Sequence, residues 1–346
     1  MSPPAGLNES YAIAGVHEVS FDLIKDGNQT EAAKLLEACR EDGIFYLNLK
    51  HLDGSDSQLL QNSASIYHLA KQLFDLPTEE KMKYDIDLFG STKVNGYKPV
   101  GRNFGGLRGN KDGFESYAIA KDTILALTPA AARHLHPPPI TTHLPLLRSL
   151  AHTLATITTT LLTTLSASPR LARVANAFHR HHRTLTRPSP DLLRLLKYHA
   201  QPSHERGAPN APHTDLGTLT VLFAASAGLQ RQRPDTGAWE WVPPRDGCAV
   251  VNVGDALEAL SMGVLRSCVH RVVPAGEQGP GMRERWSWAW LQRPEGGTVM
   301  RGLLVEGEGE GITVEEWLER KFQALRRVER RVGEAWVVTG QRKAVG

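Results

Sequence analysis

The sequence contains few cysteines and no long hydrophobic run. Its 346 residues include 3 cysteines, a small and odd number that argues against a disulfide framework and favours a reducing compartment. No stretch approaches the ~18 consecutive apolar residues expected of a membrane span. The first residues, 1–6, lack the basic region and apolar run of a secretory signal. We therefore expect a cytoplasmic protein that does not bind membranes.

Charge of one sign is also scarce. The 40 basic and 37 acidic residues leave a formal net charge of +3, and no block of five or six like charges occurs. Composition therefore gives no case for a nucleic acid or an anionic membrane as partner, and we expect a monomer that binds a small molecule. The hydrophobic share of 41% is sufficient for one large folded unit.

Short β-like runs separated by turns dominate the second half of the chain. Their number and spacing predict two packed antiparallel sheets, a jelly roll, in a mainly β protein with flanking helices (α+β). Helices are predicted over 144–165 and 311–325. The predicted strands are Leu192–Tyr198, Thr218–Phe223, Leu229–Arg231, Trp239–Val242, Ala249–Val253, Cys268–Val273 and Trp286–Leu291.

A histidine and an aspartate stand two residues apart just before one of these strands. In an extended chain His213 and Asp215 point to the same side and can bind one cation. His270, within another predicted strand, is the best third ligand, and His199 and His204 are the alternatives. Two histidines and one carboxylate on one face of an octahedron form an Fe(II) site with positions open for substrate and oxygen. By itself the His-x-Asp pair can arise by chance, because the chain has 14 histidines.

The segment Arg285–Trp290 alternates strictly, which is typical of a strand. Its three tryptophans fall on one face and are expected to pack into the core. The opposite face presents Arg285 and Ser287, a guanidinium and a hydroxyl that together could bind a small carboxylate. The alternative is that Arg285 pairs with an acidic residue of the sheet.

Two other segments have compositions that resemble binding sites. The histidines of 179–182 lie in a basic, polar stretch without carboxylates or cysteines at suitable spacing, which favours a solvated helix face over a second metal site. The glycines of 101–109 do not fit the spacing of a phosphate-binding loop, and we interpret this segment as a flexible loop near the substrate entrance.

The order His-x-Asp, distant His and Arg-x-Ser resembles the Fe(II)/2-oxoglutarate-dependent dioxygenases, in particular the isopenicillin N synthase-like family. The resemblance extends over residues 11–325, with one poorly matched middle segment. Matching stretches are Leu73–Lys81, Gly96–Tyr97, Lys111–Tyr117 and Val251–Leu257.

The resemblance implies a double-stranded β-helix, the jelly-roll core of that family. We expect an N-terminal helix and strand region over 1–125 and a helical segment over 126–190. The catalytic core would follow over 191–300 and a C-terminal helical segment over 301–346, all packed as one unit.

The resemblance also implies Fe(II), 2-oxoglutarate as cosubstrate and O2. His213, Asp215 and His270 would bind the iron, and Arg285, Ser287 and Tyr198 the 2-oxoglutarate. The family oxidises small molecules by hydroxylation, desaturation or ring modification, with succinate and CO2 as coproducts, and a hydrophobic secondary metabolite is the expected substrate class. The alternatives are an Fe(II) oxidase that does not use 2-oxoglutarate, and a small-ligand binding protein without catalysis on the same fold.

The substrate pocket is assigned from loop position alone. The pocket is expected to be lined by the closing helix and by Tyr97, Phe104, Leu107, Tyr117 and Phe223. These five residues are equally compatible with an ordinary position in the core. Leu196 departs from the family pattern, because many relatives carry a polar residue there. A glycine-rich insertion over 274–282 is the second departure.

Overall fold

The computed structural model describes residues 12–103, 111–174, 178, 180–200, 210–273, 284–300 and 311–326. Its main element is an eight-stranded sheet in which every neighbouring pair is antiparallel except β1 and β2. The strands lie in the order β1 (Glu18–Ser20), β2 (Ile44–Asn48), β10 (Cys248–Val253), β7 (Leu219–Ala224), β12 (Arg285–Gln292), β5 (Leu192–Tyr198), β4 (Phe114–Ala120) and β3 (Gly96–Lys98).

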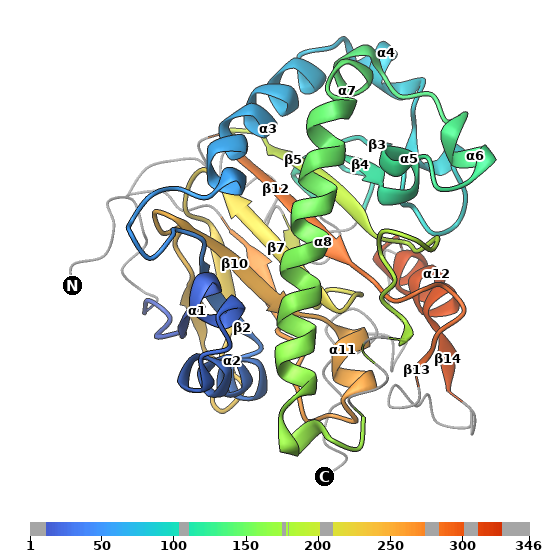
Figure 1. Ribbon diagram of the computed structural model, residues 1–346. Helices are drawn as coiled ribbons and strands as arrows, with labels where there is room; N and C mark the ends of the chain where they lie inside the picture. The colour runs from blue at the N-terminus through green and yellow to red at the C-terminus, as the bar shows by residue number, and fades with distance from the viewer. Residues whose placement is uncertain are drawn as a thin grey trace.

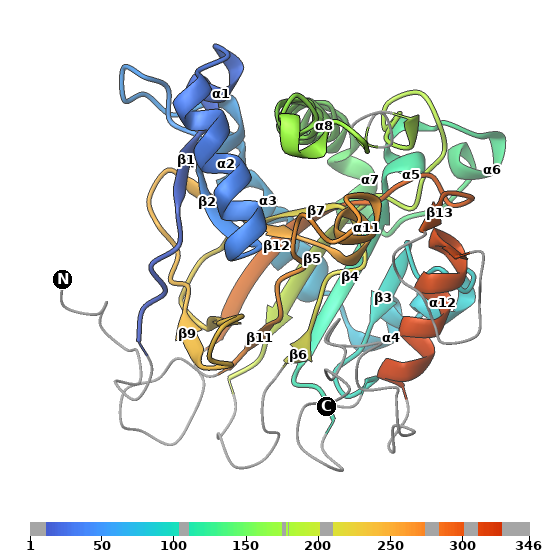
Figure 2. The same ribbon diagram turned by 90° about the horizontal axis from the view of Figure 1, so that it is seen from below.

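A second, four-stranded sheet faces the first. Its order is β6 (Asn210–His213), β11 (His270–Val272), β8 (Leu229–Gln232) and β9 (Trp239–Trp241). The two sheets enclose the barrel interior, as the view from below shows (Figure 2). The predicted jelly roll of a mainly β protein is therefore confirmed, although four strands of the large sheet come from residues before 125.

Helices cover the outer face of the large sheet. The longest, α8 (Leu144–Ser166), runs across the sheet with α1, α2 and α3 on the same side (Figures 1 and 2). In the described part of the chain no helix is long and apolar enough to cross a membrane. The remaining helices are α1 (Phe21–Lys25), α2 (Gln29–Glu41), α3 (Gln58–Phe74), α4 (Thr78–Met82), α5 (Lys121–Leu125), α6 (Pro129–Ala132), α7 (Pro138–Thr142), α11 (Asp255–Leu260) and α12 (Val314–Leu325).

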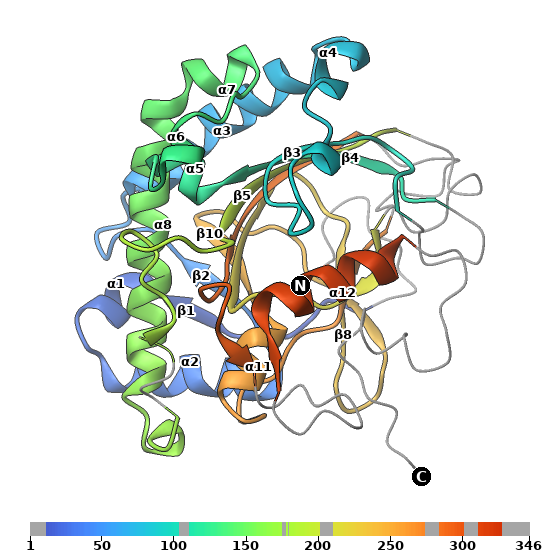
Figure 3. The ribbon, with the colours of Figure 1, turned by 90° about the vertical axis from the view of Figure 1, so that its right-hand side faces the viewer.

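The C-terminal helix α12 lies on the other side of the large sheet from α8 (Figure 3). It follows a two-stranded ribbon of β13 (Val299–Met300) and β14 (Ile312–Thr313). Thr313 and Glu316 form a capping box at its start, which satisfies free backbone N–H groups of the first turn. Trp317 and Leu318 bury one face of the helix, so it is fixed against the body of the protein.

Strict alternation on β12 separates the two faces of the large sheet. Trp286, Trp288 and Trp290 are buried in the core between sheet and helices, as the sequence predicts. Trp288 stacks on Phe223 of β7 with ring centroids 4.2 Å apart. Because neighbouring side chains on a strand point to opposite faces, Arg285 and the other odd-numbered residues of β12 face the barrel interior.

Candidate metal centre

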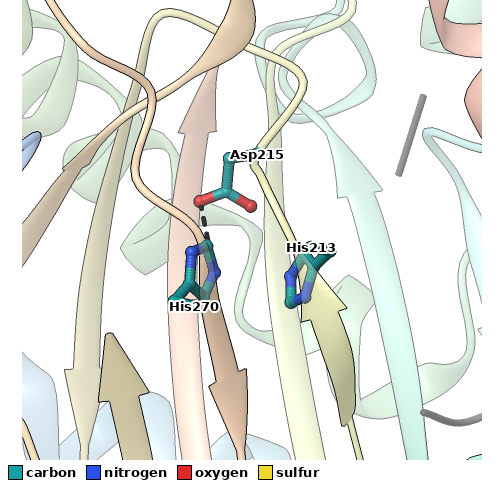
Figure 4. Close-up of side chains that lie close together, drawn as sticks. All are labelled: His213, Asp215 and His270. Carbon is teal, nitrogen blue, oxygen red and sulfur yellow. Dashed lines mark ion pairs between the residues drawn. The ribbon is translucent and has the colours of Figure 1, made fainter. Parts of the chain in front are cut away.

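The side chains of His213, Asp215 and His270 converge between the two sheets (Figure 4). His213 ends β6, Asp215 follows it by two residues, and His270 begins the neighbouring strand β11, where it pairs directly with His213. One ligand atom from each residue lies within 4.8 Å of the others, and this is the single group of potential metal ligands among the described residues. The spacing that the sequence suggested therefore corresponds to one point in space.

Backbone contacts orient both histidines. The Nδ1 atom of His213 lies 2.7 Å from the carbonyl oxygen of Ala211, and that of His270 lies 3.0 Å from the carbonyl oxygen of Cys268. A carbonyl only accepts, so each Nδ1 carries the proton and donates, which leaves each Nε2 free to bind a metal. The Nε2 of His270 lies 3.9 Å from Oδ2 of Asp215.

The electrostatic environment keeps His213 and Asp215 in the protonation states that a cation requires. Burial and the neighbouring His270 lower the pKa of His213 to about 3, so its imidazole is neutral. Burial opposes ionisation of Asp215, but His270, His213 and hydrogen bonds from Thr220 and Asn252 outweigh it and lower the pKa of Asp215 to about 2. Two imidazoles and a carboxylate form the donor set that binds Fe(II) with open positions.

Of the two alternative third ligands, His199 does not reach this point. His199 is 41% exposed and its Nε2 lies 2.9 Å from Oε1 of Glu115, on the helix-covered side of the large sheet. His204 lies outside the described residues.

Arg285 lies in the barrel interior without an acidic partner among the described residues. Its side chain is buried, its Nε donates to the carbonyl of Ser226, and its Nη1 donates to Oγ of Ser287 over 3.3 Å. The guanidinium lies over the ring of Tyr198, 5.0 Å from the centroid, and burial lowers its pKa. The three residues expected to bind 2-oxoglutarate are therefore grouped together, and the alternative ion pair for Arg285 is not found there.

Three of the residues expected to bind the substrate lie in the core on the helix-covered face of the large sheet. Tyr97 and Tyr117 pair across β3 and β4 and are buried in the core below the helices, as is Phe223. None of the three lines the cavity that includes His213, so this placement does not fit the expectation. Phe104 and Leu107 lie outside the described residues.

The histidine segment 179–182 also differs from the expectation in part. His182 is buried, not solvated: its Nε2 lies 2.6 Å from Oγ1 of Thr218, at the start of β7. This hydrogen bond fixes the segment to the sheet. His179 is outside the described residues, as are most of the glycine loop and the whole 274–282 insertion.

The sequence did not predict a lysine that supports the segment carrying His213 and Asp215. The ammonium of Lys321 on α12 donates to both oxygens of Thr214, the residue between the two ligands His213 and Asp215, at 2.8 Å each. It also donates to Oδ2 of Asp255, whose Oδ1 accepts from Ser267 near the third ligand. All four side chains are buried. Only the capping signal of α12 could have located this helix, and nothing in the sequence indicated the contact.

Comparisons with known proteins agree with this geometry. The model of the 2OG-Fe(II) oxygenase superfamily matches residues 190–294, and a model described as the N-terminal region of the non-haem dioxygenase in morphine synthesis matches residues 18–139. The 2-oxoglutarate-dependent dioxygenase gloE of Glarea lozoyensis is 33% identical over 89% of this chain and 87% of its own length. The 2-oxoglutarate-dependent dioxygenase frbH of a Dothideomycetidae species is 30% identical over 96% and 98%.

Solved structures share the fold. A putative 2OG-Fe(II) oxygenase family protein from Caulobacter crescentus superposes with a TM-score of 0.68 at 24% identity, covering 90% of this chain and 99% of its own. The rice dioxygenase for auxin oxidation gives a TM-score of 0.63 at 23% identity over 90% and 99%.

Proposed function

Because this chain belongs to the 2OG-Fe(II) oxygenase superfamily, we propose that His213, Asp215 and His270 bind its catalytic Fe(II). The protein is an oxidoreductase that uses Fe(II), 2-oxoglutarate and O2. The convergence of the three ligand atoms within 4.8 Å carries the residue assignment. With two histidines held at Nδ1 and a carboxylate already ionised, the protein side of the site is organised for a divalent cation.

We propose further that Arg285, Ser287 and Tyr198 bind the distal carboxylate of 2-oxoglutarate. Arg285 is buried and has no acidic partner among the described residues, so an incoming carboxylate would supply the missing counter-charge. Its hydrogen bond to Ser287 places a hydroxyl beside the guanidinium. When bound, iron and 2-oxoglutarate together reduce O2 and oxidise a C–H bond of the substrate, with succinate and CO2 as coproducts.

The chain's own residues orient the reactants and limit the access of water. The barrel interior around Arg285 lies between the large sheet, whose other face carries the buried tryptophans of β12, and the second sheet. A small secondary metabolite is the substrate class that we infer. A 30% identical relative from Citrus sinensis is named Kihadalactone A synthase, and it aligns with 73% of this chain. We expect the enzyme to act as a cytoplasmic monomer.

Succinate formation tests the proposal directly. Purified protein with Fe(II), 2-oxoglutarate and O2 should release succinate slowly even without a substrate, and the His270→Ala variant should release none. Anaerobic addition of 2-oxoglutarate to the Fe(II) protein should produce a visible charge-transfer absorption. Rapid O2 uptake without consumption of 2-oxoglutarate would instead identify an oxidase, and no O2 uptake with any candidate substrate would favour a binding protein.

A further inference from the structure

A cavity of about 100 Å³ lies beside the candidate metal centre, and His213 is part of its wall. Much of the remaining wall is apolar. Phe114 and Leu196 contribute from the inner face of the large sheet, and Phe322 and Leu325 from helix α12. Apolar walls with a few polar groups beside a reactive centre are typical of small-molecule sites. Arg285, Ser287 and Tyr198 do not line this cavity, so it is distinct from the region assigned to 2-oxoglutarate.

The cavity wall carries an excess of positive charge. Four cations line it, Lys93, Lys98, Arg194 and Arg326, against one carboxylate, Asp112. Lys98 pairs with Asp112 at 2.8 Å. Lys93 and Arg326 share Asp87, outside the wall, at 2.8 and 2.6 Å.

Arg194 is the fourth lining cation, and among the described residues it forms no ion pair with a carboxylate. Its Nε is enclosed and has no hydrogen-bond partner there, and burial lowers its pKa. The carboxylate that acts on it electrostatically is Asp215, which we assign to the iron. A guanidinium stays protonated, so leaving its buried Nε without an acceptor is costly.

The neighbouring strands leave room for this guanidinium. Arg194 is on the inner face of β5, and its direct partners are Ala118 on β4 and Ala289 on β12. One alanine on each side of this long side chain leaves space above the sheet into which the guanidinium can extend. The cavity wall therefore contains a guanidinium with no hydrogen bond to the described residues, between two small neighbours.

Register separates Arg194 from the 2-oxoglutarate region. Arg285 pairs with Tyr198, whereas Ala289 pairs with Arg194, so the two arginines lie four residues apart along the sheet. At about 3.4 Å per residue this is roughly 14 Å between backbone positions. Leu196 and Ser287 occupy the pair between them. A single small dicarboxylate such as 2-oxoglutarate therefore does not require contacts with both arginines.

We propose that this cavity is the substrate pocket and that Arg194 binds a carboxylate of a small, mainly apolar substrate. This inference rests on the proposed function, because it places the substrate beside the iron. A closed cavity of roughly 150 Å³ accommodates benzene. The cavity here, of about 100 Å³, is open on one side, so it can take up part of an aromatic or hydrocarbon body while the rest extends outward. The substrate class is then a carboxylic acid with a compact hydrocarbon or aromatic body, with a C–H bond oriented toward His213 and its neighbours.

A comparison of acids with their neutral amides tests the charge requirement. The probes are phenylacetate against phenylacetamide and cinnamate against cinnamamide, titrated calorimetrically into anaerobic Mn(II)-loaded protein with saturating 2-oxoglutarate. Mn(II) removes turnover, and 2-oxoglutarate occupies the Arg285 region. We expect each acid to bind at least tenfold more tightly than its amide. Equal affinities for both pairs would overturn the proposal.

Three variants assign the preference to Arg194. Arg194→Met should bring acid and amide to equal affinity, while Arg194→Lys should retain part of the preference because it keeps the charge. Lys93→Met is the matched comparison: it also removes a lining cation, but one already paired with Asp87, so the preference should fall by less than threefold. An Arg194→Met protein that still prefers the acids would overturn the proposal.

The 2-oxoglutarate dependence separates this proposal from the one on which it rests. With Fe(II), Arg194→Met should have the wild-type KM for 2-oxoglutarate in substrate-free succinate release. A large increase would show that Arg194 serves the cosubstrate, which also overturns the inference. If wild-type protein releases no succinate, the proposed function fails, whereas the acid preference of the Mn(II) protein is measured independently of turnover.

Discussion

Arg285 and Arg194 are two arginines on the inner face of adjacent strands of the same sheet, and their surroundings differ. Arg285 is fully buried, and its position is set by Ser226, Ser287 and the Tyr198 ring. Arg194 is flanked by alanines, and its Nε has no partner among the described residues. A guanidinium held by its neighbours is preorganised for one constant ligand, whereas one with open surroundings can serve ligands that vary. We therefore propose that the cosubstrate binds at one end of the interior and the substrate at the other.

The largest effect is expected from substitution of the iron ligands, which should abolish function at the cosubstrate site and the substrate site together. His213→Ala, Asp215→Ala or His270→Ala should abolish iron binding and turnover, because each removes one of three protein ligands. Iron content after dialysis and succinate release are the measurements. Removal of metal from wild-type protein with a chelator should give the same loss, and re-addition of Fe(II) should restore only the wild type. Iron-dependent activity in any of the three variants would refute the triad.

Arg285→Ala should affect the cosubstrate end alone. A charge-assisted hydrogen bond to a carboxylate contributes about 1.5 to 3 kcal/mol, so the KM for 2-oxoglutarate should rise about 10- to 100-fold. Arg285→Lys is the control, because it keeps the charge and loses the two-pronged geometry, and it should give a smaller increase. An unchanged KM would place the distal carboxylate elsewhere.

Lys321→Met should weaken the metal centre without touching either anion site. Supporting partners of metal ligands typically change affinity by about 10- to 100-fold, and we expect about a tenfold weaker affinity for Fe(II) or Co(II). The variant also leaves Asp255 without its cation, so the urea midpoint should fall. A purely structural lysine would lower the midpoint and leave the metal affinity unchanged. The double variant with Asp255→Asn should recover stability but not metal affinity.

Tyr198→Phe should give the smallest effect. The ring that lies over Arg285 is kept and only the hydroxyl is lost, so one hydrogen bond of about 0.5 to 1.5 kcal/mol is removed. The KM for 2-oxoglutarate should rise about two- to tenfold, measured beside Arg285→Ala under the same conditions. A larger increase than that of Arg285→Ala would reverse the ranking of the two residues.

The pair of His213 and Asp215 and the β core could be predicted from sequence because each depends on a local pattern, whereas His270 is distant in sequence and was only the best of three candidates. His-x-Asp specifies one face of an extended segment, and the strict alternation of residues 285–290 specifies which side chains enter the barrel. The predicted strand Leu192–Tyr198 and the helix over 144–165 agree with the observed elements to within one residue.

The residues that line the cavity could not be predicted, because the face of the sheet on which each residue lies depends on strand parity and on long-range pairing. Tyr117 lies one residue from Ser116, which lines the cavity, and this single step turns the tyrosine toward the helices. Lys321 and Thr214 are 107 positions apart in sequence, and no local pattern relates them. His182 likewise is bound by Thr218, a contact that only the folded chain creates.

Helix α12 contributes to two properties of the enzyme through one element. Lys321 supports the segment between two candidate iron ligands, and the adjacent residue, Phe322, lines the cavity proposed for the substrate. Chimaeras that exchange this helix between relatives should therefore change substrate preference and iron retention together. Directed evolution of new substrate scope would do better to vary Phe322 and Leu325 while keeping Lys321 constant.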